Sequence, residues 1–174
     1  ASNNSTIAVT FNEAVFNTIG GSGALEASDF ALSISGGVAT LNDATPSSIS
    51  PSGNVYTLGL NLSGTPNGAE TLTVVPSGAT AIYDATGNAA STTQSNNTIS
   101  LNDQAAPIVS GTTIASNNST IAVTFNEAVY NAIGGSGALD VSDFALSISG
   151  GVATVNATPS SISPSGNVYT LGLN

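Results

Sequence analysis

The sequence predicts an all-β protein whose units are antiparallel β-sandwiches repeated in tandem. Three observations predict this fold: short runs in which apolar and polar residues alternate, turn residues between those runs, and an internal repeat about one small domain long. The 3.6-residue period of an amphipathic helix appears nowhere at length. At most one helical turn is expected, around residues 24–27, just before Ser28-Asp29-Phe30.

The opening stretch STIAVTF has the alternation of a strand with one buried face. Ile7, Val9 and Phe11 share one side of such a strand, and small or polar residues occupy the other side. Similar runs predict strands at DFALSIS (29–35), VATLN (38–42), NVYTLGLNL (54–62), ETLTVV (70–75), ATAIY (79–83), NTISL (97–101) and PIVSGTTI (107–114). In three of these strands the apolar residues that share one face are Phe30, Leu32 and Ile34; Tyr56, Leu58, Leu60 and Leu62; and Leu72 and Val74. About seven short strands in one unit fit a two-sheet antiparallel sandwich.

Turn residues separate these runs. Gly36-Gly37 predicts a tight hairpin between residues 29–35 and 38–42. Ser52-Gly53-Asn54 precedes the strand at 54–62, and Pro66-Asn67-Gly68 supplies an Asn-Gly step that tolerates positive φ.

The internal repeat covers nearly the whole chain. Residues 1–40 match residues 115–154 at all but four positions, and residues 44–61 match residues 157–174 without a difference. The offset is 114 before Asp43 and 113 after it, so the second copy lacks one residue where a loop can absorb the loss. A period of this length suits a whole small domain, and the chain holds one full period and about half of another.

The composition excludes several partner classes. The chain contains ten Asp and Glu residues but no Lys, Arg, His, Cys or Met. Without basic residues, the chain lacks the electrostatic attraction to nucleic acid, and an anionic membrane surface repels it. The absence of Cys excludes disulfides and thiolate metal sites. No apolar run approaches the length of a membrane span, and any targeting signal is expected outside these residues.

The chain contains few of the residue types that enzymes use for catalysis. General acid–base and nucleophilic catalysis draw mostly on His, Cys, Lys or activated Ser and Thr, and the base that would activate a hydroxyl is missing. Only a carboxylate pair remains for hydrolysis, and Glu26 with Asp29 has a suitable spacing. No aromatic or basic residue lies nearby to hold a substrate, so we interpret this pair as solvated surface or a cation site. The sequence therefore predicts a protein that is not an enzyme.

Four short motifs occur in a characteristic order: TFNEAV (10–15 and 124–129), SDFALSISGG (28–37 and 142–151), IYDATGNAAS (82–91) and LNDQAAPIVS (101–110). In this order they resemble the bacterial immunoglobulin-like repeats that occur in tandem in large secreted surface proteins and adhesins. The resemblance covers the whole chain. It implies immunoglobulin-like antiparallel β-sandwich domains in tandem, secretion, and a spacer or adhesive role.

The resemblance also implies domain boundaries. Residues 1–106 would form one immunoglobulin-like repeat that lacks its first strand, because a domain of this family would begin at Pro107 with PIVSGTTI. Residues 107–174 would form a second repeat that is truncated before its last strands. We expect the strands of this half copy to pair with segments equivalent to residues 62–106, supplied by the continuing chain or by a neighbouring subunit.

The carboxylates have no cationic side chain to pair with, which suggests calcium. Ca²⁺ is the hard cation that suits Asp, Glu, Asn and carbonyl oxygens. In an immunoglobulin-like sandwich the incoming linker lies beside the loops after the second and sixth strands. A junction site would draw on Asn102, Asp103 and Glu127, and Glu13 with Asp84 would hold the equivalent end of the upstream copy.

Each of these carboxylates also has a plainer interpretation. Asp84 would cap its own DATGN turn through an Asx hydrogen bond, and Glu127 would lie exposed at a strand end.

The predicted function is structural: each copy is a rigid spacer in a stalk, filament or adhesin on the cell surface, assembled as a tandem or head-to-tail array with identical repeats as partners. The alternative is a module that binds glycan or protein through loops at one domain end. Its best candidate is the flexible loop at Gly20-Gly21-Ser22-Gly23. No nucleic acid and no direct membrane binding are expected, and the predicted location is extracellular.

Overall fold

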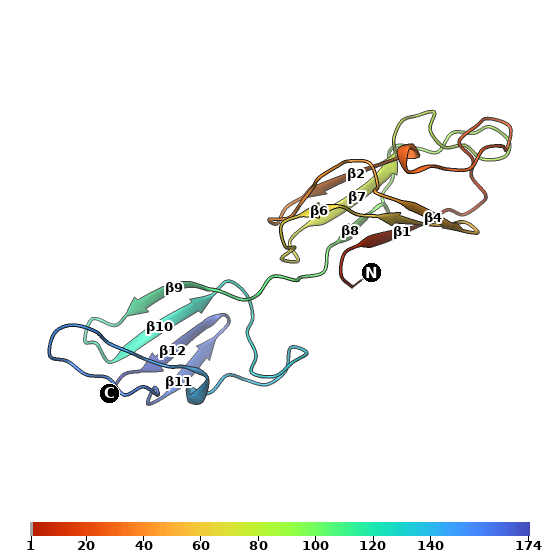
Figure 1. The fold of residues 1–174 in the computed structure, drawn as a ribbon. Coiled ribbons are helices and arrows are strands. Elements are labelled where there is room, and N and C mark those ends of the chain that lie inside the picture. Colours follow the sequence, from red (N-terminus) through yellow and green to blue (C-terminus); the bar gives the residue numbers. More distant parts are fainter. Residues whose placement is uncertain (1) are drawn as a thin grey trace. The chain divides into compact units, whose positions relative to one another are not determined.

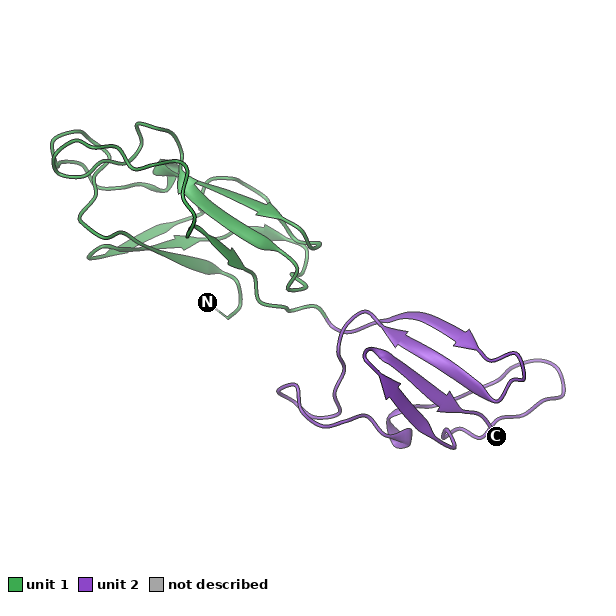
Figure 2. Ribbon diagram, turned by 180° about the vertical axis from the view of Figure 1, so that it is seen from behind, with its two compact units in different colours: residues 1–105 green, residues 106–174 purple. Residues whose placement is uncertain are grey.

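A computed structural model describes residues 2–174 of the chain, which divides into two compact units, residues 1–105 and residues 106–174 (Figures 1 and 2). In both units the described residues form antiparallel strands and short 3-10 turns, so the predicted all-β class is confirmed. No helix among them is long and apolar enough to cross a membrane.

The described residues of the first unit form eight strands and one 3-10 turn. In chain order they are β1 (Thr6–Thr10), η1 (Ala27–Asp29), β2 (Phe30–Ser35), β3 (Thr40–Leu41), β4 (Ile49–Ser52), β5 (Val55–Gly59), β6 (Leu62–Ser63), β7 (Thr71–Pro76) and β8 (Thr98–Ser100). They form two three-stranded sheets, β1-β5-β4 and β2-β7-β8, and a two-stranded ladder, β3-β6.

The core of the first unit lies between its two larger sheets. Leu58 of β5 and Leu72 of β7 are fully buried, and both belong to one apolar cluster with residues of β2. Three rings meet in this cluster, because Phe11 lies 6.4 Å from Phe30 and 5.7 Å from Tyr56 between ring centroids. The arrangement is consistent with a β-sandwich, and the alternation had placed all these residues on inward faces.

The second unit contains a single sheet. Its elements are β9 (Val109–Ile114), β10 (Thr120–Phe125), η2 (Val141–Asp143), β11 (Ile162–Ser165) and β12 (Val168–Gly172), with strand order β11-β12-β10-β9. β10 and β12 repeat the pairing of β1 and β5 residue for residue: Ile121 lies opposite Leu171, as Ile7 lies opposite Leu58. β9 lies along the other side of β10.

One predicted strand of the second copy does not form. The segment FALSIS is strand β2 in the first unit, but the identical residues 144–149 are not strand. β2 makes its ladder with β7, where Leu32 lies opposite Val74. The described part of the second unit has no counterpart of β7, so the same six residues have no partner strand there.

Several other predicted elements differ from the structure. Gly36-Gly37 was expected to join a hairpin, but β2 pairs with β7 and β3 pairs with β6, so the two glycines turn the chain between sheets. The predicted strand at 54–62 divides into β5 and β6. Residues 79–83 form no strand, and only Tyr83 makes isolated bridges. The edge strand β4 was not predicted, because Pro51 argues against a strand interior although an edge tolerates it.

Candidate functional site

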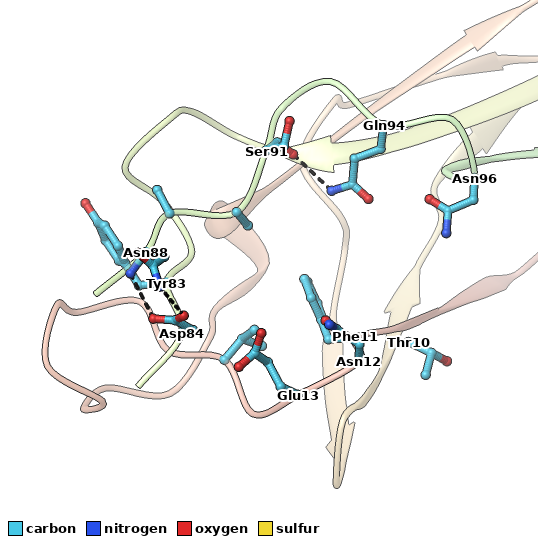
Figure 3. Close-up of a pocket in the computed structure, with 13 residues that line it drawn as sticks. Thr10, Phe11, Asn12, Glu13, Tyr83, Asp84, Asn88, Ser91, Gln94 and Asn96 are labelled. Carbon is cyan, nitrogen blue, oxygen red and sulfur yellow. Dashed lines mark hydrogen bonds between the residues drawn. The ribbon is translucent and has the colours of Figure 1, made fainter. Parts of the chain in front are cut away.

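A polar cleft of the first unit lies where the loop after β1 meets the loop between β7 and β8 (Figure 3). Its volume is about 370 Å³, and its walls include Glu13, Asp84, Asn88, Gln94 and Asn96. The sequence analysis had placed Glu13 and Asp84 at the same end of this unit, and the structure brings them to one cleft. The cleft therefore presents carboxylate and amide oxygens, and no cationic group lines it.

Two backbone hydrogen bonds hold the walls of the cleft together. Phe16 N–H donates to the Tyr83 carbonyl, and Tyr83 N–H donates to the Phe16 carbonyl, both at 2.8 Å. This bridge fixes the loop that carries Glu13 beside the turn that carries Asp84. Gly21 approaches the same turn, since a Cβ on it would come within 3.3 Å of the Ala85 Cα.

Asp84 is held by its own turn. Its carboxylate accepts hydrogen bonds from the Asn88 side chain at 2.7 Å, the Asn88 backbone at 2.8 Å and the Thr86 backbone at 2.9 Å. The side-chain bond from Asn88 is the largest influence, and these bonds together lower the pKa of Asp84 to about 2, against the opposing effect of burial. The contacts of Asp84 in the structure are therefore those of a residue that caps its own turn.

Glu13 is exposed, and no described residue donates a hydrogen bond to its carboxylate. Within the described residues, no three acidic side chains lie close enough together to hold a metal ion. A calcium ion takes about six to eight oxygens, and tight sites use several carboxylates. Glu13, with Asp84 already committed to its turn, therefore fits at most a weak calcium site completed by amide oxygens and water.

The residues of the predicted junction site lie in different units. Asn102 belongs to the first unit, where its backbone N–H donates to the Asn4 side chain at 2.9 Å and its carbonyl accepts from the same side chain at 2.7 Å. Asp103 accepts from Ala105 N–H at 2.9 Å in an Asx turn. Glu127 belongs to the second unit, where the Asn126 side chain lies 3.4 Å from it. Calcium binding at the junction stays a prediction.

The carboxylate pair Glu26 and Asp29 closes a 3-10 turn. Asp29 accepts from Glu26 N–H at 2.7 Å, and the Glu26 side chain accepts in return at the start of η1. Asp140 and Asp143 make the same reciprocal contacts around η2. The helical turn was expected at residues 24–27, but the structure has a 3-10 turn at residues 27–29 and a second one at residues 141–143. Both carboxylates of the pair act as caps.

Glu70 is a buried carboxylate that the sequence analysis did not single out. Its side chain is 0 % exposed, and it accepts backbone hydrogen bonds from Val38 at 2.8 Å, Ala39 at 2.9 Å and Asn67 at 3.0 Å. Burial alone would raise the pKa of this carboxyl, but the backbone donors outweigh it and lower the pKa. Glu70 thus fastens the Gly36-Gly37 turn and the Asn67 turn to the start of β7.

A signal for Glu70 was present in the alternation. Glu70 has the same parity as Leu72 and Val74, which are both buried, so it had to face inward as well. A lone carboxylate on an inward face needs backbone donors in a chain without cations. Val38 and Ala39, which follow the Gly36-Gly37 turn, and Asn67 supply them.

Comparison with known proteins adds no relative. No protein-family model, no curated protein and no solved structure matches the chain.

Proposed function

We propose that this chain is a structural repeat, a spacer or stalk segment in a long extracellular filament or cell-surface adhesin. Its units would be immunoglobulin-like domains arranged as a tandem or head-to-tail array. In this proposal each copy bears mechanical load and adds length to the array. The copies are nearly identical in sequence because each one contacts the same kind of neighbouring repeat.

The observation that carries the proposal is the contrast between two identical segments. FALSIS forms β2 in the first unit, where β7 lies beside it, and forms no strand in the second unit. Ile148 is 54 % exposed, although its equivalent Ile34 packs against the core of the first unit. The second copy thus repeats the sequence of residues 1–61 of the first but shows only part of the packing that these residues make there.

An open apolar cleft in the second unit supports the same proposal. It has a volume of about 650 Å³ and is lined by Ile121, Val123, Phe125, Phe144 and Leu146. The equivalents of the last two, Phe30 and Leu32, are buried in the first unit, where β7 pairs beside β2 in the same sheet. We infer that strands equivalent to β7 and β8 cover this cleft in the assembled array, supplied by a further repeat in the same chain or by a neighbouring subunit.

The surface chemistry supports the proposal of an inert extracellular spacer. The chain has a formal net charge of −10 and no Lys or Arg, so nucleic acid and anionic membranes are poor partners. Glu26 and Asp29, a pair with a spacing suited to hydrolysis, make capping contacts, and so do their equivalents Asp140 and Asp143. These features support a role that is not catalytic.

Electron microscopy of purified chains with increasing numbers of the repeat tests this proposal. Rods whose length grows in proportion to the number of repeats are expected. Compact particles whose longest dimension does not grow with repeat number would exclude a spacer role.

A second candidate function rests on the cleft of the first unit. Its walls combine amide side chains with the rings of Phe11 and Tyr83, and such polar and aromatic surfaces suit glycans. The proposal would be a glycan- or protein-binding adhesion module that uses the loops at one domain end. A glycan array probed with the full chain separates the two functions, because a spacer binds none of the glycans and an adhesion module binds a defined subset.

In the array, calcium would bind weakly in the cleft that holds Glu13 and Asp84. Millimolar Ca²⁺ is then expected to raise the melting temperature by mass action on the folded state, and Glu13→Gln should remove most of that rise. Glu26→Gln serves as the matched control, since Glu26 lies outside this cleft. Superimposable melting curves in Ca²⁺ and in chelator would exclude the site.

A further inference from the structure

The segment that leaves the first unit is bonded to that unit beyond its last strand. Residues 101–105 follow β8 and are not strand themselves, and we call them the exit strap. The N–H groups of Gln104 and Ala105 both donate to the carbonyl of Pro66, at 2.8 and 3.0 Å. The chain is therefore fixed to the first unit as far as Ala105, past the end of β8 at Ser100.

The middle of the exit strap is held by the buried side chain of Asn4, which is 4 % exposed. The amide oxygen of Asn4 accepts from the Asn102 backbone N–H at 2.9 Å, and its amide nitrogen donates to the Asn102 carbonyl at 2.7 Å. The Asn102 side chain donates a third hydrogen bond to the same oxygen at 3.1 Å. A single amide side chain thus binds both backbone groups of Asn102, because an amide carries one acceptor and one donor side by side.

The second copy shows that the turn around Asn4 forms without a strap. Asn118 is the equivalent of Asn4, and the two residues have φ 56° and φ 54°, in the left-handed region that Asn tolerates. Asn118 is nevertheless exposed, and no hydrogen bond reaches its side chain from the described residues, where Asn102 has no counterpart in the second unit. The backbone of this turn is therefore independent of the strap, and the burial of Asn4 comes from the strap.

The strand before the exit strap is short and lies at the edge of its sheet. β8 has three residues, all exposed, and within the described residues it pairs with β7 alone. Tension on the outgoing chain would separate such a strand from β7 one residue pair after another, beginning at Ser100. Asn4 precedes β1 in one sheet, and Pro66 precedes β7 in the other. Tension therefore reaches contacts with both sheets before it reaches β8.

We propose that Asn4 and Pro66 hold the exit strap as one piece, and that the strap protects β8 from tension applied through the outgoing chain. While the strap is bonded, the turn before β1 and the turn before β7 share the load. When the strap detaches, β8 bears the load alone. The proposal rests on the proposed spacer function, because a chain that bears tension is the one that needs this protection.

Native-state hydrogen exchange on the full chain tests whether the strap is held as one piece. Asn4→Gly removes the side chain and keeps a residue that tolerates positive φ. We expect the amides of Asn102, Gln104 and Ala105 to exchange at least roughly tenfold faster in this variant, the effect of losing about one net hydrogen bond. Gln104 and Ala105 bind Pro66, so faster exchange there shows that Asn4 holds the whole strap. Faster exchange at Asn102 alone would make Asn4 a local contact and overturn the proposal.

Asn118→Gly is the matched control, because it makes the same backbone change where no strap is bound. It should leave exchange in residues 101–105 unchanged, and protected amides in β5 show that the fold is intact in both variants. If Asn4→Gly does not fold, the pair Asn4→Ser and Asn118→Ser decides by the same criterion, since the shorter hydroxyl cannot bind both backbone groups of Asn102.

Unfolding of single full chains at constant force tests the response to tension. One handle is attached at Ile19→Cys, an exposed loop position, and the other at the C-terminus, so that the pull passes through the exit strap. The chain has no cysteine of its own to compete for the handle. We expect the first unit to unfold roughly tenfold sooner in Asn4→Gly than in Asn118→Gly. The two units release different lengths of chain, so the step in extension identifies the first unit.

Equal lifetimes of the first unit in the two variants would contradict the proposal. This outcome is separate from the test of the spacer function, because it is measured on single chains. Rods that grow with repeat number, together with equal lifetimes, would reject the strap alone. Compact particles would reject the spacer function and leave the exchange result standing.

Discussion

At the scale of single residues, carboxylates in this chain are held by backbone and amide donors instead of cations. Asp84 is bound by Asn88 and Thr86 in a turn of five residues, and Glu70 is bound across the fold by the N–H groups of two other turns. Both arrangements favour the charged form of the carboxyl, so both lower the pKa. They show how a chain without Lys or Arg keeps inward or half-buried acidic groups ionised.

Titration of Asp84 is expected to have its midpoint near 2 in the folded protein, below the ordinary 3.8 of the side chain. A depressed pKa means that the contribution of this carboxylate to the turn is present above about pH 4 and is lost as the pH falls toward 2. Asn88→Ala should move the midpoint upward, because the side-chain bond from Asn88 is the largest cause of the shift. Carboxyl NMR shifts measure both values, and a midpoint unchanged by Asn88→Ala would contradict this assignment.

The sequence predicted apolar positions more reliably than polar ones. Phe11, Phe30 and Tyr56 were placed inward by alternation, and their rings meet in the core. The inward position of Glu70 follows from the same rule, but its donors come from turns about thirty residues earlier and three residues earlier in the chain. Hydrogen bonds between residues so far apart in the chain depend on the fold. The sequence therefore predicts that Glu70 is buried, but it does not predict which residues donate hydrogen bonds to it.

At the scale of elements, strand propensity is not sufficient for a strand. Residues 30–35 and 144–149 have one sequence and two conformations, because one copy has β7 beside it and the other does not. The hairpin expected at Gly36-Gly37 does not form, for a related reason. Local residue types favoured a turn, and the turn is present, but the pairing partner of each flanking strand was decided by packing between sheets.

The two copies of the glycine turn provide a matched pair of substitutions. Gly37 has φ 59° and Gly151 has φ 68°, so alanine at either site incurs backbone strain of roughly 1 kcal/mol. A Cβ at Gly37 also meets the Glu70 carboxylate, whereas a Cβ at Gly151 meets nothing within 4 Å.

Gly37→Ala is therefore expected to destabilise its unit by roughly 1–3 kcal/mol more than Gly151→Ala destabilises the other unit, because it displaces a buried acceptor of several N–H groups. Urea unfolding followed by amide signals from each unit measures the difference. Equal losses at the two positions would show that Glu70 does not fasten this turn.

At the scale of the whole molecule, the surface carries negative charge only. The chain has ten acidic side chains, no basic ones, and an isoelectric point near 4.1. Trypsin has no cleavage site in such a chain, which suits an exposed extracellular fibre.

Acidification removes the mutual repulsion of these carboxylates, so solubility should fall as the pH approaches 4. Turbidity measured from pH 7 downward tests this expectation, with added salt at pH 7 as the control for simple screening. A clear solution at pH 4, more soluble than at pH 7, would contradict it.

The two units carry complementary parts of one sandwich. Among residues 2–174, the first unit has β7 and β8 but no strand on the outer edge of β1, and the second has β9 on the equivalent edge of β10 but no counterpart of β7 or β8. Each leaves exposed the apolar residues that the other unit's extra strands would cover, including Ile99 in the first and Ile148 in the second. This complementarity is the physical basis for proposing an array.

Native-state hydrogen exchange at the duplicated segment FALSIS tests the central claim, that the second copy requires strands equivalent to residues 62–106. In the chain of 174 residues, amides of residues 30–35 should exchange at least roughly a hundredfold more slowly than those of residues 144–149. Appending a copy of residues 62–106 after Asn174 should bring residues 144–149 to the protection of residues 30–35, while the paired strands β5 and β12 stay protected throughout. Equal protection of the two segments before the addition, or no gain after it, would contradict the account.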